Sequence, residues 1–507
     1  MSSFQKNLKI NSFSKFSRNV VLSLQGFLLT PIVIQFLGLE GASVWFLITQ
    51  FMAYVQLSDL GITTGLIRIS SSYLSTNNEN SSRKVLTVSL FLLLIIALLI
   101  TISAEYFLCI FFSIFDLSDN SGDIQFAFIF ALIVSAINLP LRCGISILES
   151  HQKFFIHLRI ETIFIVLRVC VLYFFSYLNL LDLISLSIIY FGTNLFIHAI
   201  QFFCAIKLSP IYNLKDTFRN TTPQLKQIFT IGLSVMIVTA SATTLRQGTP
   251  ILVGLVNGID KSVTLFTITM LLVFSIMQLL TLPVSFVGPE ATRLHSQKKY
   301  TELYSIFILF SKYSLLFATF VSISFATFGK AFLSFWLDVD KNEIHTIYQL
   351  TFFIVSFFSF SIPSLYARMI LSFVNKHIIT SILELLIVIT GLIFGYINIV
   401  KFNLGLFGIA FGIVTIFILR TFGPLMVVSV RYFKINIKKY LTDLYLKYTF
   451  LMIAALSVYL ILLFFVSNEN IVHALTLSLF TILAWSYMLE NVHKDEIKHF
   501  FAKYLNQ

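Results

Sequence analysis

The sequence has little charge, little cysteine and no phosphate-binding loop, and each shortage excludes a class of protein. Only 11% of its 507 residues are charged, whereas a soluble protein carries about a quarter to cover its surface. The four cysteines (Cys109, Cys143, Cys170 and Cys204) are too widely spaced for a metal motif, so we interpret them as small buried hydrophobic residues. A GxxxxGK motif is missing, which excludes nucleotide binding of that type. Water is therefore not the main solvent of this chain.

Hydrophobic runs recur along the whole chain, whose hydrophobic content is 57% and mean hydropathy +0.89. A helix needs roughly 20 apolar residues to cross the hydrocarbon core of a membrane. This rule predicts spans at 19–36, 43–66, 85–110, 124–141, 160–180, 183–205, 227–255, 263–287, 304–328, 346–367, 378–399, 404–430, 447–466 and 471–489. We therefore expect an all-α integral membrane protein with about 14 transmembrane helices.

The distribution of basic residues predicts the orientation of these helices. If the N-terminus is cytoplasmic, most of the 35 lysines and arginines fall in cytoplasmic segments. The basic residues expected in outer loops are Lys261, Lys330, Lys341 and Lys401. The net charge of +12 then lies against anionic membrane lipids, and no basic domain is present that would bind nucleic acid. We expect a multi-pass protein with both its N- and C-termini in the cytoplasm.

A short segment repeats at the ends of the first and seventh spans. Residues 30–33 read TPIV and residues 249–252 read TPIL, and each precedes a turn with glycine and an acidic residue. An even number of crossings separates the copies, which predicts parallel repeats of the kind found in transporters. The predicted division is a six-helix lobe at 1–206, a cytoplasmic linker at 207–226, a second six-helix lobe at 227–430, and two additional helices with a cytoplasmic tail at 431–507.

Residues 31–74 read PIVIQFLGLEGASVWFLITQFMAYVQLSDLGITTGLIRISSSYL. The Leu37-Gly38 turn, Trp45, the Asp59-Leu60-Gly61 step, and Arg68 with its following serines make this run resemble the opening of bacterial Wzx-like polysaccharide-export flippases. These proteins belong to the MATE/MOP transporter superfamily.

The resemblance implies a MOP-type fold, a place in the bacterial cytoplasmic (inner) membrane, and a lipid-linked oligosaccharide as substrate. It further implies a polysaccharide polymerase and a chain-length regulator as partners. Relatives often carry an acidic residue where this chain has Arg246 and Gln247, so the resemblance does not fix a coupling ion.

Charged residues inside predicted spans are the candidate site residues, because each costs on the order of 3 kcal/mol unless it meets water or a partner. Arg246 lies in the most polar stretch of any span. We interpret it as a cavity-lining cation that holds pyrophosphate, with an interhelical ion pair or snorkelling toward the headgroups as the alternative. The candidate contacts for pyrophosphate or glycan are Arg246, Arg420, Arg168, Gln247 and Arg68.

The candidate coupling or cavity acids are Asp59, Glu384 and Glu105. Two candidates have a local alternative: Asp59 could make a structural bond to a helix end, and Arg168 could pair with Glu161, seven residues earlier. Pro31, Pro250 and Pro424 are candidate hinges, since proline removes a backbone donor and bends a helix.

These features favour a flippase that translocates undecaprenyl-diphosphate-linked oligosaccharide by alternating access. A MATE-like, cation-coupled exporter of drugs or metabolites stays as the alternative, although it would be expected to concentrate acidic residues in its cavity. A membrane polysaccharide polymerase is less favoured, because no long outer loop carries a catalytic constellation. We expect no cofactor, and either H⁺ or Na⁺ coupling or the membrane potential as the driving force.

Overall fold

The computed structural model describes residues 3–117, 122–212, 222–373 and 377–423, and a few positions between 426 and 445. The predicted spans at 447–466 and 471–489, the tail that follows them, and Pro424 lie outside the described residues.

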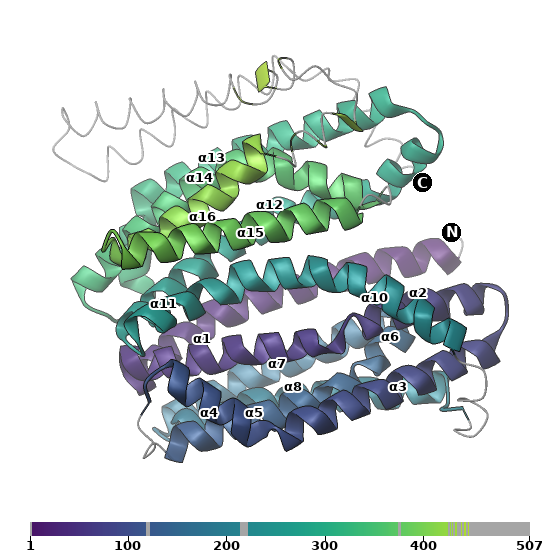
Figure 1. The fold of residues 1–507 in the computed structure, drawn as a ribbon, viewed down its shortest axis with the longest axis horizontal. Helices are drawn as coiled ribbons and strands as arrows, with labels where there is room; N and C mark the ends of the chain where they lie inside the picture. Colours follow the sequence, from purple (N-terminus) through teal and green to yellow (C-terminus); the bar gives the residue numbers. More distant parts are fainter. Residues whose placement is uncertain are drawn as a thin grey trace. The chain divides into compact units, whose positions relative to one another are not determined.

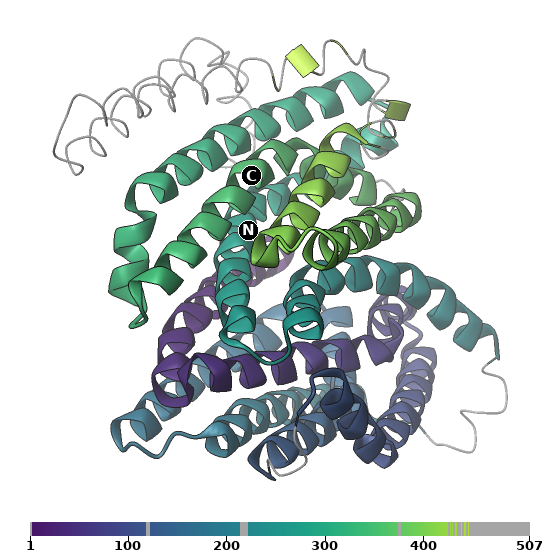
Figure 2. The same cartoon turned by 60° about the vertical axis from the view of Figure 1, so that its left-hand side comes forward.

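The regular structure within the described ranges is helical (Figure 1; Figure 2). In chain order the helices are α1 (Ser3–Val55), the 3-10 turn η1 (Gln56–Asp59), α2 (Ile62–Ser75), α3 (Glu79–Ile102), α4 (Ala104–Ile114), α5 (Gly122–Leu141), α6 (Cys143–Ser150), α7 (Phe154–Tyr177), α8 (Leu183–Leu208), α10 (Thr222–Thr243), the π turn η2 (Thr244–Gly248), α11 (Thr249–Asn257), α12 (Lys261–Ser296), α13 (Tyr300–Trp336), α14 (Lys341–Phe373), α15 (His377–Val400) and α16 (Gly405–Phe422). Ten segments of the described chain are long and apolar enough to cross a membrane. The prediction of an all-α, multi-pass membrane fold is therefore confirmed.

The chain divides into two compact units. Unit 1 comprises Met1–Ser275, Trp336–Glu343 and Ser381–Ile413, and unit 2 comprises Ile276–Phe335, Ile344–Thr380 and Val414–Gln507. Unit 1 thus contains residues from both sides of the predicted linker at 207–226. The lobe boundaries expected from the sequence stay a prediction.

Two glycine turns lie at one end of unit 1. Gly38 divides α1 into two helices with φ 69° and ψ 179°, and Gly258 ends α11 with φ 73° and ψ −167°. Only glycine adopts these angles readily. Gly38 follows Thr30 of the TPIV copy by eight residues and Gly258 follows Thr249 of the TPIL copy by nine, so each copy is followed by a similar backbone turn at nearly the same distance.

Buried hydroxyl groups join these two turns. The Ser43 Oγ donates to the Asp260 carbonyl oxygen at 2.7 Å, and the Thr264 Oγ1 donates to the Leu39 carbonyl oxygen at 2.8 Å. The two hydroxyl oxygens are themselves 2.8 Å apart, and neither side chain is accessible. We call Ser43, Thr264 and the two carbonyl groups the turn latch.

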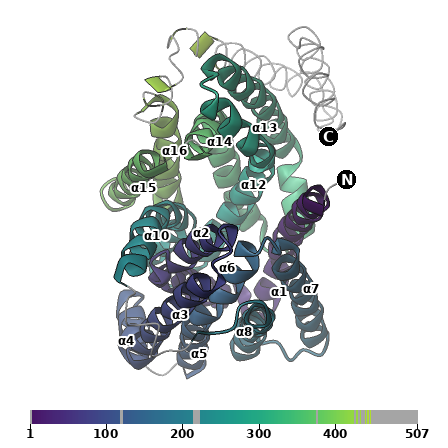
Figure 3. The same cartoon turned by 90° about the vertical axis from the view of Figure 1, so that its right-hand side faces the viewer.

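The predicted second span is broken between α1 and α2. Leu60 and Gly61 both have positive φ values (50° and 73°) after η1. A Cβ on Gly61 would lie 2.1 Å from the Gly232 carbonyl oxygen on α10, so the two backbones meet here without side chains between them. Figure 3 shows α10 beside α2 at this crossing.

Unit 2 is joined internally by buried hydroxyl groups. Tyr366 on α14 donates to the Leu280 carbonyl oxygen of α12 at 2.9 Å and bonds the Ser314 hydroxyl of α13. Ser322 and Ser359 bond each other at 2.8 Å between α13 and α14. Interhelical bonds of this kind stabilise membrane bundles, where apolar burial between helices contributes little.

Candidate functional site

Arg246 lies on the π turn η2, between α10 and α11. Pro250 follows four residues later and has no N–H to donate to the Arg246 carbonyl group, so the regular α-helical bond is impossible and the helix widens. Turns of this type occur frequently at functional sites. The polar sequence around Arg246 thus coincides with a local distortion of the helix.

The Arg246 side chain is accessible, although protein atoms surround most of its guanidinium group. The guanidinium lies 5.6 Å from the centre of the Phe274 ring. Within the described part of the chain it makes no hydrogen bond and no ion pair. Its donors are therefore not committed to any described protein group.

The π turn packs on α1 through Tyr54. The Tyr54 hydroxyl lies against Gly248 of this turn. Gly248 allows this approach, because a Cβ at that position would lie 2.7 Å from the Tyr54 oxygen. Gln247, the neighbouring candidate, is partly exposed on the same turn.

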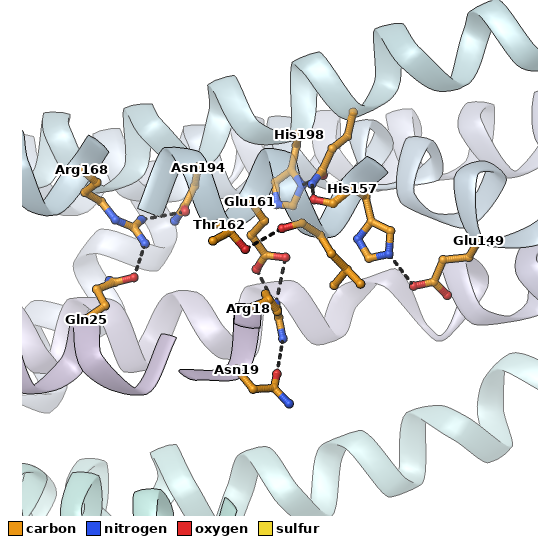
Figure 4. Close-up of polar contacts among 12 residues, drawn as sticks. Arg18, Asn19, Gln25, Glu149, His157, Glu161, Thr162, Arg168, Asn194 and His198 are labelled. Carbon is orange, nitrogen blue, oxygen red and sulfur yellow. Dashed lines mark hydrogen bonds and ion pairs between the residues drawn. The ribbon is translucent and has the colours of Figure 1, made fainter. Parts of the chain in front are cut away.

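Arg168 is buried between α1, α7 and α8 and is held by neutral groups (Figure 4). Its Nη2 donates to the Gln25 Oε1 at 2.7 Å, and its Nη1 donates to the Asn194 Oδ1 at 2.9 Å and the Tyr190 carbonyl oxygen at 3.3 Å. The guanidinium also lies 4.3 Å from the centre of the Tyr190 ring. Only 3% of the residue is exposed, whereas Arg246 is accessible.

The local ion pair between Arg168 and Glu161, considered as the simpler interpretation of the sequence, is wrong. Glu161 instead accepts two hydrogen bonds from Arg18 on α1, at 2.7 and 3.0 Å. Figure 4 shows this pair beside the Arg168 cluster, together with the contact between His157 and Glu149 at 3.2 Å. The only acid near Arg168 along α7 is therefore already occupied by another arginine.

Tyr190 on α8 contacts Arg168 through both its aromatic ring and its carbonyl group. Trp45 lies edge-on to the Tyr190 ring, with ring centres 5.4 Å apart. Arg168, Tyr190 and Trp45 thus form one packed cluster within unit 1.

Asp59 uses its carboxylate locally. One oxygen accepts from the Gly61 N–H at 2.8 Å and the other accepts from the Thr63 hydroxyl at 2.6 Å. These hydrogen bonds give acceptors to donor groups at the start of α2, just after the break, and aspartate is commonly found in this capping role. Ion coupling by Asp59 stays a prediction, and the structural bond to a helix end is what the geometry favours.

The remaining candidates are spread over both units. Arg68 is exposed on α2, and Glu105 is exposed in the first turn of α4. Glu384 is buried on α15 of unit 1. Arg420 is buried on α16 of unit 2, where its guanidinium lies 5.6 Å from the Phe417 ring centre. Their roles stay predictions, and within the described ranges His, Cys, Asp and Glu side chains form no group of three that could hold a metal ion.

The two matched prolines have different local structures. Pro31 lies within α1, and the Phe27 carbonyl oxygen that it leaves without a helical partner accepts a 2.7 Å hydrogen bond from the Trp336 indole N–H. Pro250 instead follows the π turn. The hinge role of both prolines stays a prediction.

Four residues of unit 1 with notable contacts were not predicted from the sequence: Gln25, Asn194, Tyr190 and Trp336. All four are uncharged polar or aromatic residues that recur in ordinary membrane helices, whereas most of the predicted contacts were charged. Gln25 and Asn194 did carry a usable signal, because a primary amide in the middle of an apolar run needs a partner.

No protein-family model matches the chain, and no curated protein sequence matches it. Solved structures do match its fold. The lipid II flippase MurJ, in an inward closed conformation, is 14% identical with a TM-score of 0.68, over 94% of this chain and 99% of that one. A multidrug resistance MATE family transporter of the MOP superfamily, in an inward-facing conformation, is 15% identical with a TM-score of 0.65, over 83% and 97%.

A third match is a MOP superfamily transporter from Pyrococcus furiosus, described as having a binding pocket of reversed polarity. It is 18% identical with a TM-score of 0.58, over 85% of this chain and 95% of that one. The chain therefore has the fold of the MOP superfamily transporters. At these identities the likeness establishes the fold.

Proposed function

We propose that this protein is a flippase that translocates undecaprenyl-diphosphate-linked oligosaccharide units across the bacterial cytoplasmic membrane for the assembly of O-antigen or capsule. The observation that carries the proposal is Arg246, an accessible guanidinium on a distorted transmembrane helix that no described carboxylate neutralises. An arginine remains charged throughout a transport cycle, and its planar fork matches phosphate oxygens.

The energetics of the membrane are consistent with an anionic cargo. Moving two negative charges outward across a membrane that is 100 mV negative inside is favourable by roughly 4–5 kcal/mol. The membrane potential, alone or with H⁺ or Na⁺ coupling, would therefore drive export. A polysaccharide polymerase and a chain-length regulator are the proposed partners, and the likeness to a lipid II flippase supports a lipid-linked substrate.

The proposal is tested by replacing Arg246 in cells and measuring surface glycan. Arg246→Gln is expected to lower export at least tenfold, since it removes a charged phosphate contact of about 1.5–3 kcal/mol. Arg159→Gln is the matched control, because Arg159 is also exposed and lies 5.5 Å from a phenylalanine ring centre, that of Phe155. Normal glycan export by the Arg246→Gln strain would exclude the proposed role.

The alternative is a cation-coupled exporter of drugs or metabolites, which is supported by the likeness to MATE transporters. A deletion strain that keeps its surface glycan but becomes sensitive to cationic drugs would favour this alternative.

A further inference from the structure

One face of the second half of α1 packs on α12 through polar side chains. The Ser43 and Thr264 hydroxyl oxygens are 2.8 Å apart, and the Gln50 Nε2 donates to the Thr267 Oγ1 at 3.1 Å. Phe274 follows Thr267 by about two turns of helix, so it continues the face of α12 that packs on α1.

The π turn η2 meets the same face of α1 one turn further along. Tyr54 lies about one turn after Gln50, and a Cβ on Gly248 would lie 2.7 Å from the Tyr54 oxygen. Arg246 is on the same π turn as Gly248. The second half of α1 thus contacts both α12 and the π turn, and Arg246 and Phe274 lie where these three segments of unit 1 meet.

Arg246 and Phe274 are in contact at this crossing. The guanidinium carbon lies over the phenylalanine ring, 5.6 Å from its centre, and the Phe274 side chain is partly exposed. A cation within about 6 Å of a ring centre is attracted by the electron density of the ring face. This attraction uses none of the N–H donors of the guanidinium, and no described residue accepts a hydrogen bond from them.

The Arg168 guanidinium is held in a different way. Its Nη1 and Nη2 groups donate to Asn194 and Gln25, so the contacts that fix this side chain also occupy its donors. A guanidinium fixed through its donors has fewer of them to offer to a ligand. Arg246 is instead held by a ring, which orients the charge and leaves the donors unoccupied.

We infer that Phe274 is a positioning residue for Arg246, and that its ring holds the guanidinium in the orientation that binds a phosphoryl group of the substrate. This inference rests on the proposed function and adds to it the residue that orients the anion-binding charge.

The physical reason lies in the freedom of the arginine side chain. A long side chain that moves freely must lose rotamer freedom when it binds a ligand, and this loss weakens binding. A contact that fixes the guanidinium before the ligand arrives reduces the loss. The two parallel N–H groups of the fork then already point in directions that a phosphoryl group can use.

The first test removes the ring. The purified full-length protein in detergent micelles is titrated calorimetrically with inorganic pyrophosphate, and in a second arm with farnesyl diphosphate, a soluble isoprenoid diphosphate. Phe274→Leu keeps an apolar side chain but has no ring face, and is expected to weaken binding of both probes about fivefold, the effect of losing a cation–π contact. If Phe274→Leu does not fold, Phe274→Met is used in its place.

Two further variants separate the ring contact from packing. Phe274→Tyr keeps a ring face and is expected to bind both probes as the unchanged protein does. Phe155→Leu removes the ring from the other exposed pair, in which Arg159 lies 5.5 Å from the ring centre, and is also expected to leave binding unchanged. Equal weakening by Phe274→Leu and Phe274→Tyr, or by Phe274→Leu and Phe155→Leu, would overturn the inference, as would normal binding by Phe274→Leu.

The two probes identify what Phe274 acts on. Equal weakening of pyrophosphate and farnesyl diphosphate supports an effect on the phosphoryl contact. Weakening of farnesyl diphosphate alone would mean that Phe274 contacts the isoprenoid chain, and the positioning role would be wrong.

The second test asks whether Phe274 acts through Arg246. In the Arg246→Gln background Phe274→Leu is expected to change the affinity for pyrophosphate by less than about twofold, because the charge that the ring orients is gone. The same fivefold loss in this background would show that Phe274 acts independently of Arg246 and would contradict the inference.

The Arg246 variant also distinguishes failure of this inference from failure of the proposed function. If Arg246→Gln loses affinity for both probes while Phe274→Leu retains it, only the role of Phe274 is wrong. If Arg246→Gln binds both probes as the unchanged protein does, the proposed function itself is wrong.

Discussion

Arg168 and Arg246 carry the same charge in the same unit but have different surroundings. Arg168 is enclosed by amide and carbonyl oxygens and by a tyrosine ring, whereas Arg246 is accessible beside a phenylalanine ring. Both lie in helices that the sequence predicts to span the membrane, so hydropathy alone could not separate them. Arg168 is enclosed because it bonds Gln25 and Asn194. Both residues are far from Arg168 in the sequence, so the sequence did not show which arginine would be enclosed.

The hydrogen bond from the Trp336 indole N–H to the Phe27 carbonyl oxygen can be tested by a single substitution. Trp336→Phe keeps an aromatic ring near Phe27 but leaves the carbonyl oxygen freed by Pro31 without its donor, and is expected to destabilise the protein by about 1–3 kcal/mol. The measurement is thermal unfolding of the purified protein in detergent.

The control for this prediction is Pro31→Ala, which restores a backbone N–H that can bond the Phe27 carbonyl group. In that background Trp336→Phe is expected to have a clearly smaller effect. An equal loss of stability in both backgrounds would show that the indole contributes by packing and not by its hydrogen bond.

Single helices were more predictable than the breaks within them. A long apolar run that crosses a membrane in a helical bundle forms an α-helix, because every backbone N–H and C=O group must find its hydrogen-bond partner within the segment. The breaks depend on tertiary contacts instead. The turn η1 ends where Gly61 meets Gly232, at the crossing of α2 and α10. The predicted span at 85–110 is likewise interrupted, because it divides at Ser103 into α3 and α4.

The repeat illustrates the same limit at the scale of helices. Its TPIV and TPIL copies predict two equivalent turns, and Gly38 and Gly258 have nearly the same backbone angles. A second sequence match, Gln56-Leu57 with Gln278-Leu279, has no such counterpart in local structure. The first copy forms the turn η1, whereas the second continues as regular α12.

Gly61→Ala tests the crossing of α2 and α10. A Cβ at this position would lie 2.1 Å from a backbone oxygen that cannot move away without shifting α10, so the variant is expected to lose most of its folded yield. Gly405→Ala is the control, because Gly405 also has a positive φ (53°) but no atom within 4 Å of the added Cβ. It is expected to cost only about 1–2 kcal/mol of backbone strain. Similar yields and melting temperatures for the two variants would contradict a tight crossing.

At the scale of the whole molecule, composition and hydropathy were sufficient to predict an all-helical membrane protein, and the MOP-type fold follows from the structural likeness. The candidate site was predicted in part. Arg246 could be selected because it interrupts an apolar pattern, but the contact between Tyr190 and Arg168 could not be predicted, because tyrosine is ordinary in membrane helices and its position is set by packing.

The turn latch provides a prediction for transport by the whole molecule. If transport requires the turns at Gly38 and Gly258 to separate, a disulfide between Ser43→Cys and Thr264→Cys will stop glycan export, and a reductant will restore it. The two native hydroxyl oxygens are 2.8 Å apart, which is close enough for a bond to form. The four native cysteines are replaced by alanine in this experiment, and the single-cysteine variants are the controls. Full export by the oxidised double variant would show that the two turns stay together during transport.

The π turn also has a consequence for evolution and for engineering of this helix. A wide turn contains one residue more than a regular helix needs, and each residue rotates an α-helix by about 100°. Deleting Gly248 and replacing Pro250 by alanine should therefore allow a regular helix to form while turning Arg246 to another side relative to α11. Such a protein would retain its stability and lose its affinity for diphosphates, so that the two changes together would separate the folding of this helix from its use.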